Sequence, residues 1–147
     1  MAVPAAGQRI TTAEQGQLVS NTLQQFSATQ TTSTITMAAG VQDLTGATVT
    51  FTTTYANTKC KVIGVFDVEQ SGTPADIFVG TCVVDGSSVS GEAHSAAVRD
   101  TCMQVWDFTL TAAGSHTIKL QGAKSGSANT VKTDATHTRL SVEVFGP

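Results

Sequence analysis

From residue 34 onward, apolar and polar side chains alternate along most of the chain, and this period of two limits the fold more than any other feature. Successive side chains of a β-strand point to opposite faces of a sheet, so such alternation is typical of strands with one buried face. Residues 138–145 are a clear case, because Leu140, Val142 and Val144 share one face and polar residues separate them. Composition agrees, since the 25 threonines and 16 valines are β-branched and pack well on a pleated sheet.

The alternation predicts about eight or nine short strands joined by turns. Asp85-Gly86 is the strongest turn signal and is typical of a two-residue hairpin, while Gly91 in the returning segment hints at a bulge. No helical segment separates the strands, so we expect them to pair antiparallel in a β-sandwich, and a jelly roll in particular. The predicted strands are 34–38, 47–55, 59–70, 76–84, 87–97, 99–110, 116–122, 131–134 as an edge strand, and 138–145.

The first 33 residues follow a different pattern, which we interpret as an N-terminal arm (1–33) before the sandwich domain (34–147). Residues 11–14, Thr-Thr-Ala-Glu, match a capping box and predict a helix over about 12–26, followed by a polar linker. Isolated helices of about 12–15 residues are marginal in water, so this helix needs a partner: its own domain, a sister chain or another protein. The candidate attachment residues are Ile10, Leu18, Val19, Leu23 and Phe26.

Charge and hydropathy exclude two classes of partner. Charged residues make up only 13% of the chain, and its eight Lys and Arg are scattered, whereas nucleic-acid recognition needs them clustered. No apolar run is long enough to span a bilayer. The first residues carry no visible secretory signal. We therefore expect neither a nucleic acid nor a membrane as partner.

The three cysteines, at positions 60, 82 and 102, each fall inside a predicted strand. They show no C-x-x-C spacing, so a zinc site is disfavoured. Buried free thiols that act as small apolar residues are the favoured interpretation, and a cross-strand disulfide is the alternative.

Other residues able to carry chemistry are present without a recognisable motif. His94, His116 and His137 lie near strand ends or in loops, form no metal-binding pattern and are expected at the surface. No G-x-S-x-G occurs, and carboxylates that could be paired as in glycosidases come without a groove of aromatic residues. We therefore expect no enzymatic activity, no cofactor and no bound metal.

Two short patches resemble small virion proteins of tailed phages, especially phages of actinobacteria. Residues 4–11, Pro-Ala-Ala-Gly-Gln-Arg-Ile-Thr, resemble a Pro-Ala-x-Gly-x-x-Ile-Thr opening that precedes a short helix and a β-rich domain. Residues 113–121 and the final strand, 139–144, are similar to late strands of phage jelly-roll fibre and decoration domains. The family often has a Leu-Asn pair in its helix, whereas here Val19 follows Leu18. The resemblance implies a structural virion protein, often trimeric, with no catalytic residues.

We therefore predict a structural phage virion protein that decorates the capsid surface. One compact domain with a short arm suits decoration better than a fibre, which needs length or repeats to project. The expected partners are the chain itself, as a side-by-side homotrimer with a threonine-rich surface that is easily desolvated, and the major capsid protein or tail proteins.

The sequence leaves two alternatives open. One is a tail or fibre-tip component that contacts the host. The other, of a different class, is a small glycan-binding module, which should expose aromatic rings on its sheet or in its loops. The single tryptophan, Trp106, is expected in the core.

Overall fold

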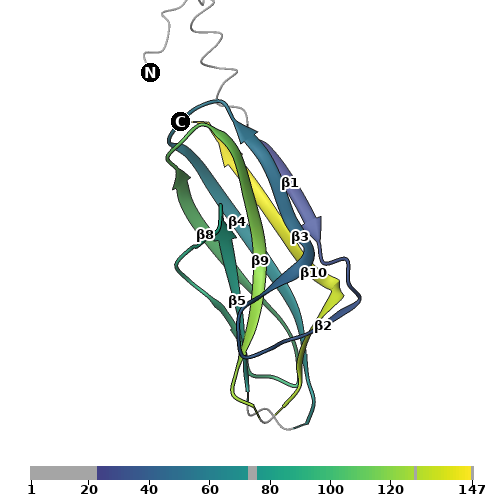
Figure 1. Ribbon diagram of the computed structural model, residues 1–147. Coiled ribbons are helices and arrows are strands. Elements are labelled where there is room, and N and C mark those ends of the chain that lie inside the picture. Colours follow the sequence, from purple (N-terminus) through teal and green to yellow (C-terminus); the bar gives the residue numbers. More distant parts are fainter. Residues whose placement is uncertain (1–22, 73–75, 128, 147) are drawn as a thin grey trace, which may run out of the picture.

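The computed structural model describes residues 23–72, 76–127 and 129–146. These residues form two antiparallel sheets of five strands each, which face one another as a sandwich (Figure 1). The predicted all-β, antiparallel sandwich is confirmed. The strands are β1 (Gln24–Thr29), β2 (Thr34–Thr36), β3 (Gln42–Thr53), β4 (Thr58–Gln70), β5 (Ile77–Val84), β6 (Ser87–Ser88), β7 (Ala93–Ser95), β8 (Arg99–Leu110), β9 (Gly114–Ser125) and β10 (Val131–Phe145).

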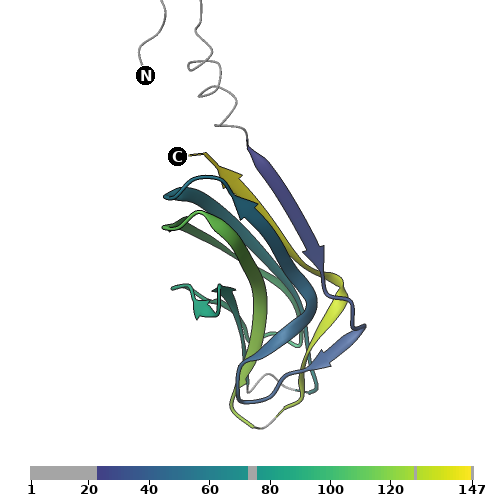
Figure 2. The same ribbon diagram turned by 45° about the horizontal axis from the view of Figure 1, so that its top comes forward.

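The strand order is that of a jelly roll. Sheet A has the order β1-β10-β4-β8, and β2 pairs with β10 on the same side as β1 (Figure 2). Sheet B has the order β3-β9-β5-β6, and β7 also pairs with β5. When the short β6 and β7 are counted as one position, the chain passes between the sheets as two interleaved Greek keys, which is the jelly-roll arrangement.

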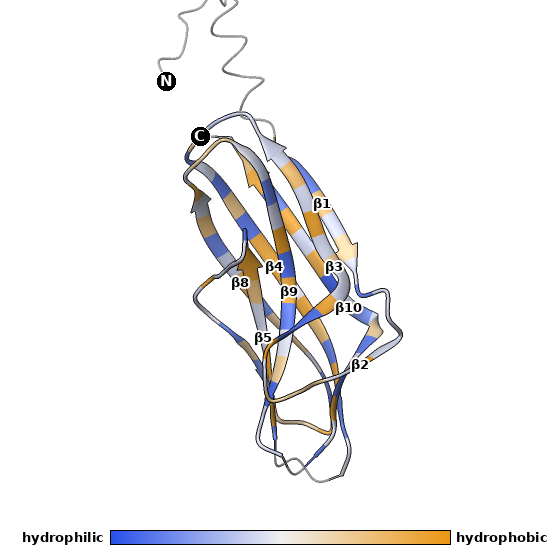
Figure 3. Cartoon of the chain, in the orientation of Figure 1, coloured by the Kyte–Doolittle hydropathy of each residue, from blue (hydrophilic) through white to orange (hydrophobic). Residues whose placement is uncertain are grey.

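The core lies between the two sheets, and orange and blue residues alternate along β4, β9 and β10 as the sequence pattern predicts (Figure 3). Trp106 is only 2% exposed, and Phe66 and Phe78 are fully buried with their ring centroids 5.3 Å apart. Gly80 makes this packing possible, because a Cβ at that position would lie 2.6 Å from the Phe66 ring. The predicted core position of Trp106 is confirmed.

The predicted Asp85-Gly86 hairpin is confirmed, with φ angles of 50° and 85° that are typical of a type I′ turn. The return from this turn is shorter than predicted, because the segment 87–97 contains two brief strands, β6 and β7, instead of one. Gly91 lies between them at φ 105°, and its carbonyl accepts a hydrogen bond of 2.8 Å from the Trp106 indole. The connecting loop therefore leaves the sheet in order to cover the edge of the core.

The helix predicted over about 12–26 is wrong at residues 24–26, which belong to β1, while 12–22 lie outside the described residues. β1 pairs with β10 from Gln24 opposite Val144 to Thr29 opposite Arg139. Pairing at the sheet edge gives the β1 backbone hydrogen-bond partners, and it lets Phe26 reach the core, where its ring stacks on another ring of sheet B. Tertiary contacts thus outweigh the weak helical pattern, and the predicted linker begins in a strand.

The prediction of an edge strand at 131–134 is also wrong. These residues and 138–145 form one long strand, β10, which lies inside sheet A between β4 on one side and β1 and β2 on the other. The register with β4 shifts between Asp134 and Arg139, where extra residues bulge out of β10. This bulge interrupts the alternation of apolar and polar residues, so the sequence pattern indicates two separate strands.

Candidate assembly surface

One end of the sandwich carries both the start of the described chain and its C-terminal strand end. Gln24 pairs with Val144, and Phe145 pairs with Lys59, so β1 begins where β10 ends (Figure 1). Residues 1–22 are joined to the sandwich at this end.

Three large apolar side chains are exposed at the same end. Leu23, just before β1, is 44% exposed, and Phe145, at the end of β10, is 37% exposed. Tyr55, in the turn between β3 and β4, is 47% exposed. We refer to the surface that Leu23, Tyr55 and Phe145 form as the terminal end. Such side chains, gathered where a further chain segment departs, are suited to contact with another surface.

The five predicted attachment residues are placed differently from one another. Ile10, Leu18 and Val19 lie outside the described residues, and Leu23 belongs to the terminal end. Phe26 faces inward, with its ring 5.0 Å from that of Phe51, so it contributes to packing in the sandwich.

Sequence reasoning missed Tyr55 and Phe145. Phe145 carried a signal, because it continues the outward-facing series Arg139, Ser141 and Glu143 with an apolar residue. Tyr55 carried none, since a tyrosine next to a turn is common.

The outer face of sheet A carries an aliphatic patch across two neighbouring strands. Ile63 lies opposite Val105, and Val65 lies opposite Met103, in the register of β4 with β8. Met103 is 58% exposed and Val105 38% exposed, while the two β4 residues are half-buried. We call these four residues the β4–β8 patch.

The outer face of β3 and β9, in sheet B, is polar by contrast. Thr50 and Thr117 share a hydrogen bond of 3.1 Å, and Asp43 accepts hydrogen bonds from Lys119 at 2.8 Å and Gln121 at 2.7 Å. These two bonds hold the pKa of Asp43 below its usual value, although burial acts weakly in the opposite sense. This face matches the threonine-rich, low-charge surface expected from the composition.

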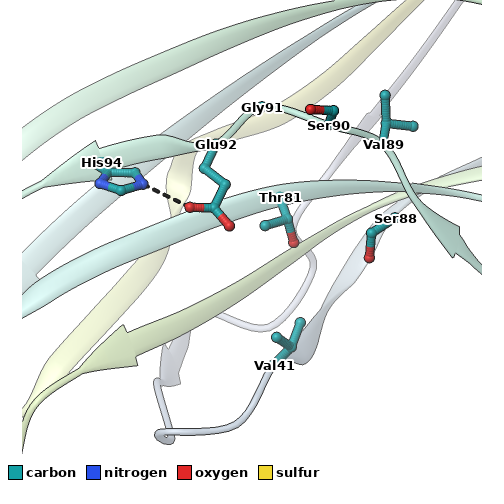
Figure 4. Close-up of a pocket in the computed structure, with 8 residues that line it drawn as sticks. All are labelled: Val41, Thr81, Ser88, Val89, Ser90, Gly91, Glu92 and His94. Carbon is teal, nitrogen blue, oxygen red and sulfur yellow. Dashed lines mark hydrogen bonds and ion pairs between the residues drawn. The ribbon is translucent and has the colours of Figure 1, made fainter.

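A groove of about 640 Å³ runs beside the β6–β7 connection (Figure 4). Glu92 and His94 lie on one side, with 2.9 Å between carboxylate and imidazole, and both side chains are about half exposed. Ser88 and Ser90 also line it, together with Thr81, whose hydroxyl oxygen is buried. The groove offers hydrogen-bonding groups to a polar ligand, but no aromatic ring lines it.

The cysteines are free, as predicted: Cys60 and Cys82 are buried and Cys102 is half-buried. Burial raises the pKa of Cys60 to about 11 and that of Cys82 to about 12. Burial, helped by the charge of Asp100, raises the pKa of Cys102 to about 11. Since the thiolate is the reactive form, these thiols are poor nucleophiles and poor metal ligands.

Two histidines are exposed as expected, but His116 is not. Its side chain is only 8% exposed, against 54% for His94 and 62% for His137. The prediction failed here because the partners that make burial tolerable, Asp85 and the Ala112 carbonyl, come from two other turns.

Across the described ranges, no group of three or more His, Cys, Asp or Glu side chains is placed to hold a metal ion. In the same part of the chain, no helix is long and apolar enough to cross a membrane.

Comparisons with known proteins define the class of fold and no closer relationship. The chain matches no known protein family and no curated protein in sequence. A crystal structure of dimeric latent PorU from Porphyromonas gingivalis is similar over 84% of this chain and 13% of that chain, with 8% identity and a TM-score of 0.54. This likeness shows a shared β-sandwich fold and nothing about activity.

Two further structures are more distant. Infectious bursal disease virus, Gt strain, matches 84% of this chain and 32% of that chain, with 14% identity and a TM-score of 0.45. The CBM36-1 domain of a multidomain xylanase from the hindgut metagenome of Trinervitermes trinervoides matches 84% of this chain and 98% of that chain, with 8% identity and a TM-score of 0.43. At these scores neither structure bears on function.

Proposed function

We propose that this protein is a structural, non-enzymatic component of a phage virion that decorates the capsid surface and attaches by its terminal end. The observation that carries the proposal is the exposure of Leu23, Tyr55 and Phe145 at the point where residues 1–22 join the sandwich. Burying an apolar side chain of this size contributes roughly 1.5–3 kcal/mol. The terminal end and residues 1–22 together supply a contact for the major capsid protein, and the rest of the sandwich projects from it.

Two features support the virion part of the proposal. The opening residues 4–11 resemble those of small phage virion proteins, and the sandwich has the jelly-roll topology of decoration domains in that family. Self-association as a homotrimer belongs to the proposal too. Mass determination in solution and on particles tests it, and a monomer in both states contradicts it.

The attachment surface can be tested by loading variants onto virus particles that lack the protein. A chain that begins at Leu23 keeps every described strand, so we expect it to fold and to lose loading. The double variant Leu23→Ser, Phe145→Ser should load at least about tenfold more weakly, because two exposed apolar contacts are lost.

The matched control is Val98→Ser, which also removes an exposed apolar side chain but lies just before β8, at the opposite end of the sandwich from the terminal end. It should load like the unaltered protein. Normal occupancy of both the shortened chain and the double variant would place attachment elsewhere on the sandwich and overturn the proposal.

The alternative of a tail or fibre-tip component uses the same terminal end but a different site on the particle. Electron microscopy of particles with the protein labelled separates the two, since decoration predicts label over the head.

The glycan-binding alternative rests on the groove beside Glu92. Exposed aromatic rings were expected for such a module, and the exposed Tyr55 and Phe145 lie at the terminal end instead. Saccharide binding that is lost in Glu92→Gln would favour this alternative over attachment to a capsid.

A further inference from the structure

β8 forms an edge of sheet A, and on its outer side no strand pairs with it in the described part of the chain. The strand is 12 residues long and keeps one unbroken register with β4, whereas proteins commonly shorten or interrupt their edge strands. An exposed edge presents a row of unpaired backbone N–H and C=O groups, which can pair with another strand. The free edge of β8 is therefore a candidate contact surface.

The ladder between β4 and β8 identifies the residues that carry the unpaired groups. The Gln70 amide donates a hydrogen bond of 2.7 Å to the Val98 carbonyl, and this pair continues the β4–β8 register. Hydrogen-bonded pairs alternate along an antiparallel ladder, so the even-numbered residues of β8 bond to β4. The odd-numbered residues of 99–109 therefore turn their backbone groups toward the free edge. The Val105 carbonyl accepts a bond of 2.9 Å from the Gln104 side chain and keeps a second lone pair.

The same odd-numbered residues place their side chains on the outer face of sheet A. Met103 and Val105, of the β4–β8 patch, are exposed in the middle of the strand, with exposed Asp107 beyond them and half-exposed Arg99 at the other end. The two terminal nitrogens of Arg99 lie 2.8 Å and 3.4 Å from carboxylates of β4, and a guanidinium has five N–H donors, so donors remain for another carboxylate. An apolar centre between opposite charges is complementary to its own copy in the antiparallel direction.

We propose that a second copy of this chain pairs antiparallel with β8 about a two-fold axis at Met103. In this register, Met103 lies opposite the partner's Met103, Thr101 opposite the partner's Val105, and Arg99 opposite the partner's Asp107. A two-fold contact is made by the same surface of both copies, so the charged pair occurs twice. Among the registers that set odd-numbered residues against one another, a shift of two residues would separate these charges and place Val105 or Thr109 opposite Arg99.

The pairing joins sheet A of the two copies into one continuous sheet and brings their β4–β8 patches together at its centre. Extension of a sheet from its edge is a common mode of recognition, in which backbone hydrogen bonds supply affinity and side chains give specificity. None of the three residues of the terminal end takes part, so the pairing does not depend on attachment to a particle. A two-fold contact joins chains in pairs, so it is separate from the proposed trimer and would link one trimer to the next.

Disulfide cross-linking tests the register, in protein with Cys102→Ser to remove the neighbouring thiol. Met103→Cys should form a covalent dimer on mild oxidation, because the axis brings the two copies of residue 103 within about 5.5 Å. Thr101→Cys is the matched control, since position 101 is exposed on the same face of β8. The two copies of residue 101 lie about 14 Å apart, so this variant should stay monomeric on a denaturing gel. Thr101→Cys with Val105→Cys should form the dimer again.

The cross-linking result distinguishes this pairing from other contacts between copies. As much covalent dimer from Thr101→Cys as from Met103→Cys overturns the register, and no dimer from either Met103→Cys or the double variant overturns the pairing. The denaturing gel reports the two-fold contact alone, whereas the mass of the unaltered protein reports the trimer. Each of the two proposals can therefore fail without the other.

Sedimentation over a concentration series gives a second test that needs no added cysteine. Asp107→Lys sets two cations against each other at both ends of the pair, so association should weaken at least about tenfold. Glu143→Lys is the matched control, because Lys61 lies opposite Asp107 on β8 and opposite Glu143 on β10. This variant makes the same change of charge beside Lys61, but away from the free edge, and should leave pairing unchanged. Equal association of the two variants overturns the proposal.

Discussion

The two edge strands of sheet A, β1 and β8, use their apolar residues in opposite ways. β1 turns Phe26 inward, onto Phe51 of the other sheet, and so closes one flank of the sandwich. β8 buries Trp106 but turns Met103 and Val105 outward, where they are 58% and 38% exposed. An apolar residue on an edge strand therefore stabilises the fold only when its side chain faces the core. The outward residues on β8 are available for other contacts.

Replacing Phe26 with Ala should remove the packing of β1 on the core and have the largest effect on stability. Loss of a packed ring should destabilise the protein by about 3 kcal/mol, because β1 keeps no other large inward side chain. Chemical denaturation measures this. Leu23→Ala is the control, since Leu23 is 44% exposed, and an equal loss in both variants would mean that Phe26 does not close the flank.

Gln30 follows β1 and anchors it from the polar side. The side chain is 3% exposed. It donates a hydrogen bond of 3.2 Å to the Thr133 carbonyl and accepts one of 2.9 Å from the Thr133 hydroxyl. Gln30→Ala removes both of these buried hydrogen bonds and should cost about 2 kcal/mol in unfolding free energy. Gln25→Ala removes only an exposed bond of 3.3 Å to Glu143 and should change the same measurement little.

The β8 edge is held by an ion pair where β1 is held by packing. Arg99 lies 2.8 Å from the carboxylate of Asp67, which is 1% exposed, while Arg99 itself is 50% exposed. Arg99→Gln should cost about 1 kcal/mol, because the buried carboxylate loses a charged donor but the exposed side of the pair is already screened. Arg139→Gln, on exposed β10 surface, serves as the control in the same thermal unfolding series. Equal stability of the two variants would remove the distinction between the edges.

The smallest effect on stability is expected for the outward residues of the β4–β8 patch. Met103→Thr with Val105→Thr should change the unfolding free energy by less than about 0.5 kcal/mol, as is usual for surface positions. Light scattering over a concentration series should nevertheless show weaker self-association, since exposed aliphatic area is removed. A large loss of stability would mean that β8 depends on these side chains as β1 depends on Phe26.

The alternation made most strands predictable, because burial on one face leaves a local record in the sequence. β1 was not predicted, because only Phe26 and Ala28 alternate in it, and so short a run does not distinguish a strand from the end of a helix. The bulge in β10 was not predicted for a related reason, since extra residues after Asp134 interrupt the alternation of apolar and polar residues. In both places the strand is specified by its neighbours in the sheet.

The candidate surface was less predictable than the fold. Leu23 was identified, but the terminal end also needs Tyr55, which reaches it through a turn that carries no signal of its own. The burial of His116 depends on Asp85, 31 residues away in sequence, and no motif joins them. Contacts of this kind follow from the topology, which a single sequence does not reveal.

The pairing of β1 with β10 sets the order in which the protein can form. Residues 24 and 144 are cross-strand neighbours, so the first described strand cannot take its place until β10 has left the ribosome. Contacts this far apart in sequence make folding slow, because the loop between them must close before the pairing stabilises it. Until β10 is made, the Phe51 ring of sheet B lacks its contact with Phe26 of β1. A chain that ends before β10 has no strand with which β1 can pair. The sandwich is therefore completed only after β10 has been synthesised, and chains that lack β10 are the ones most exposed to aggregation.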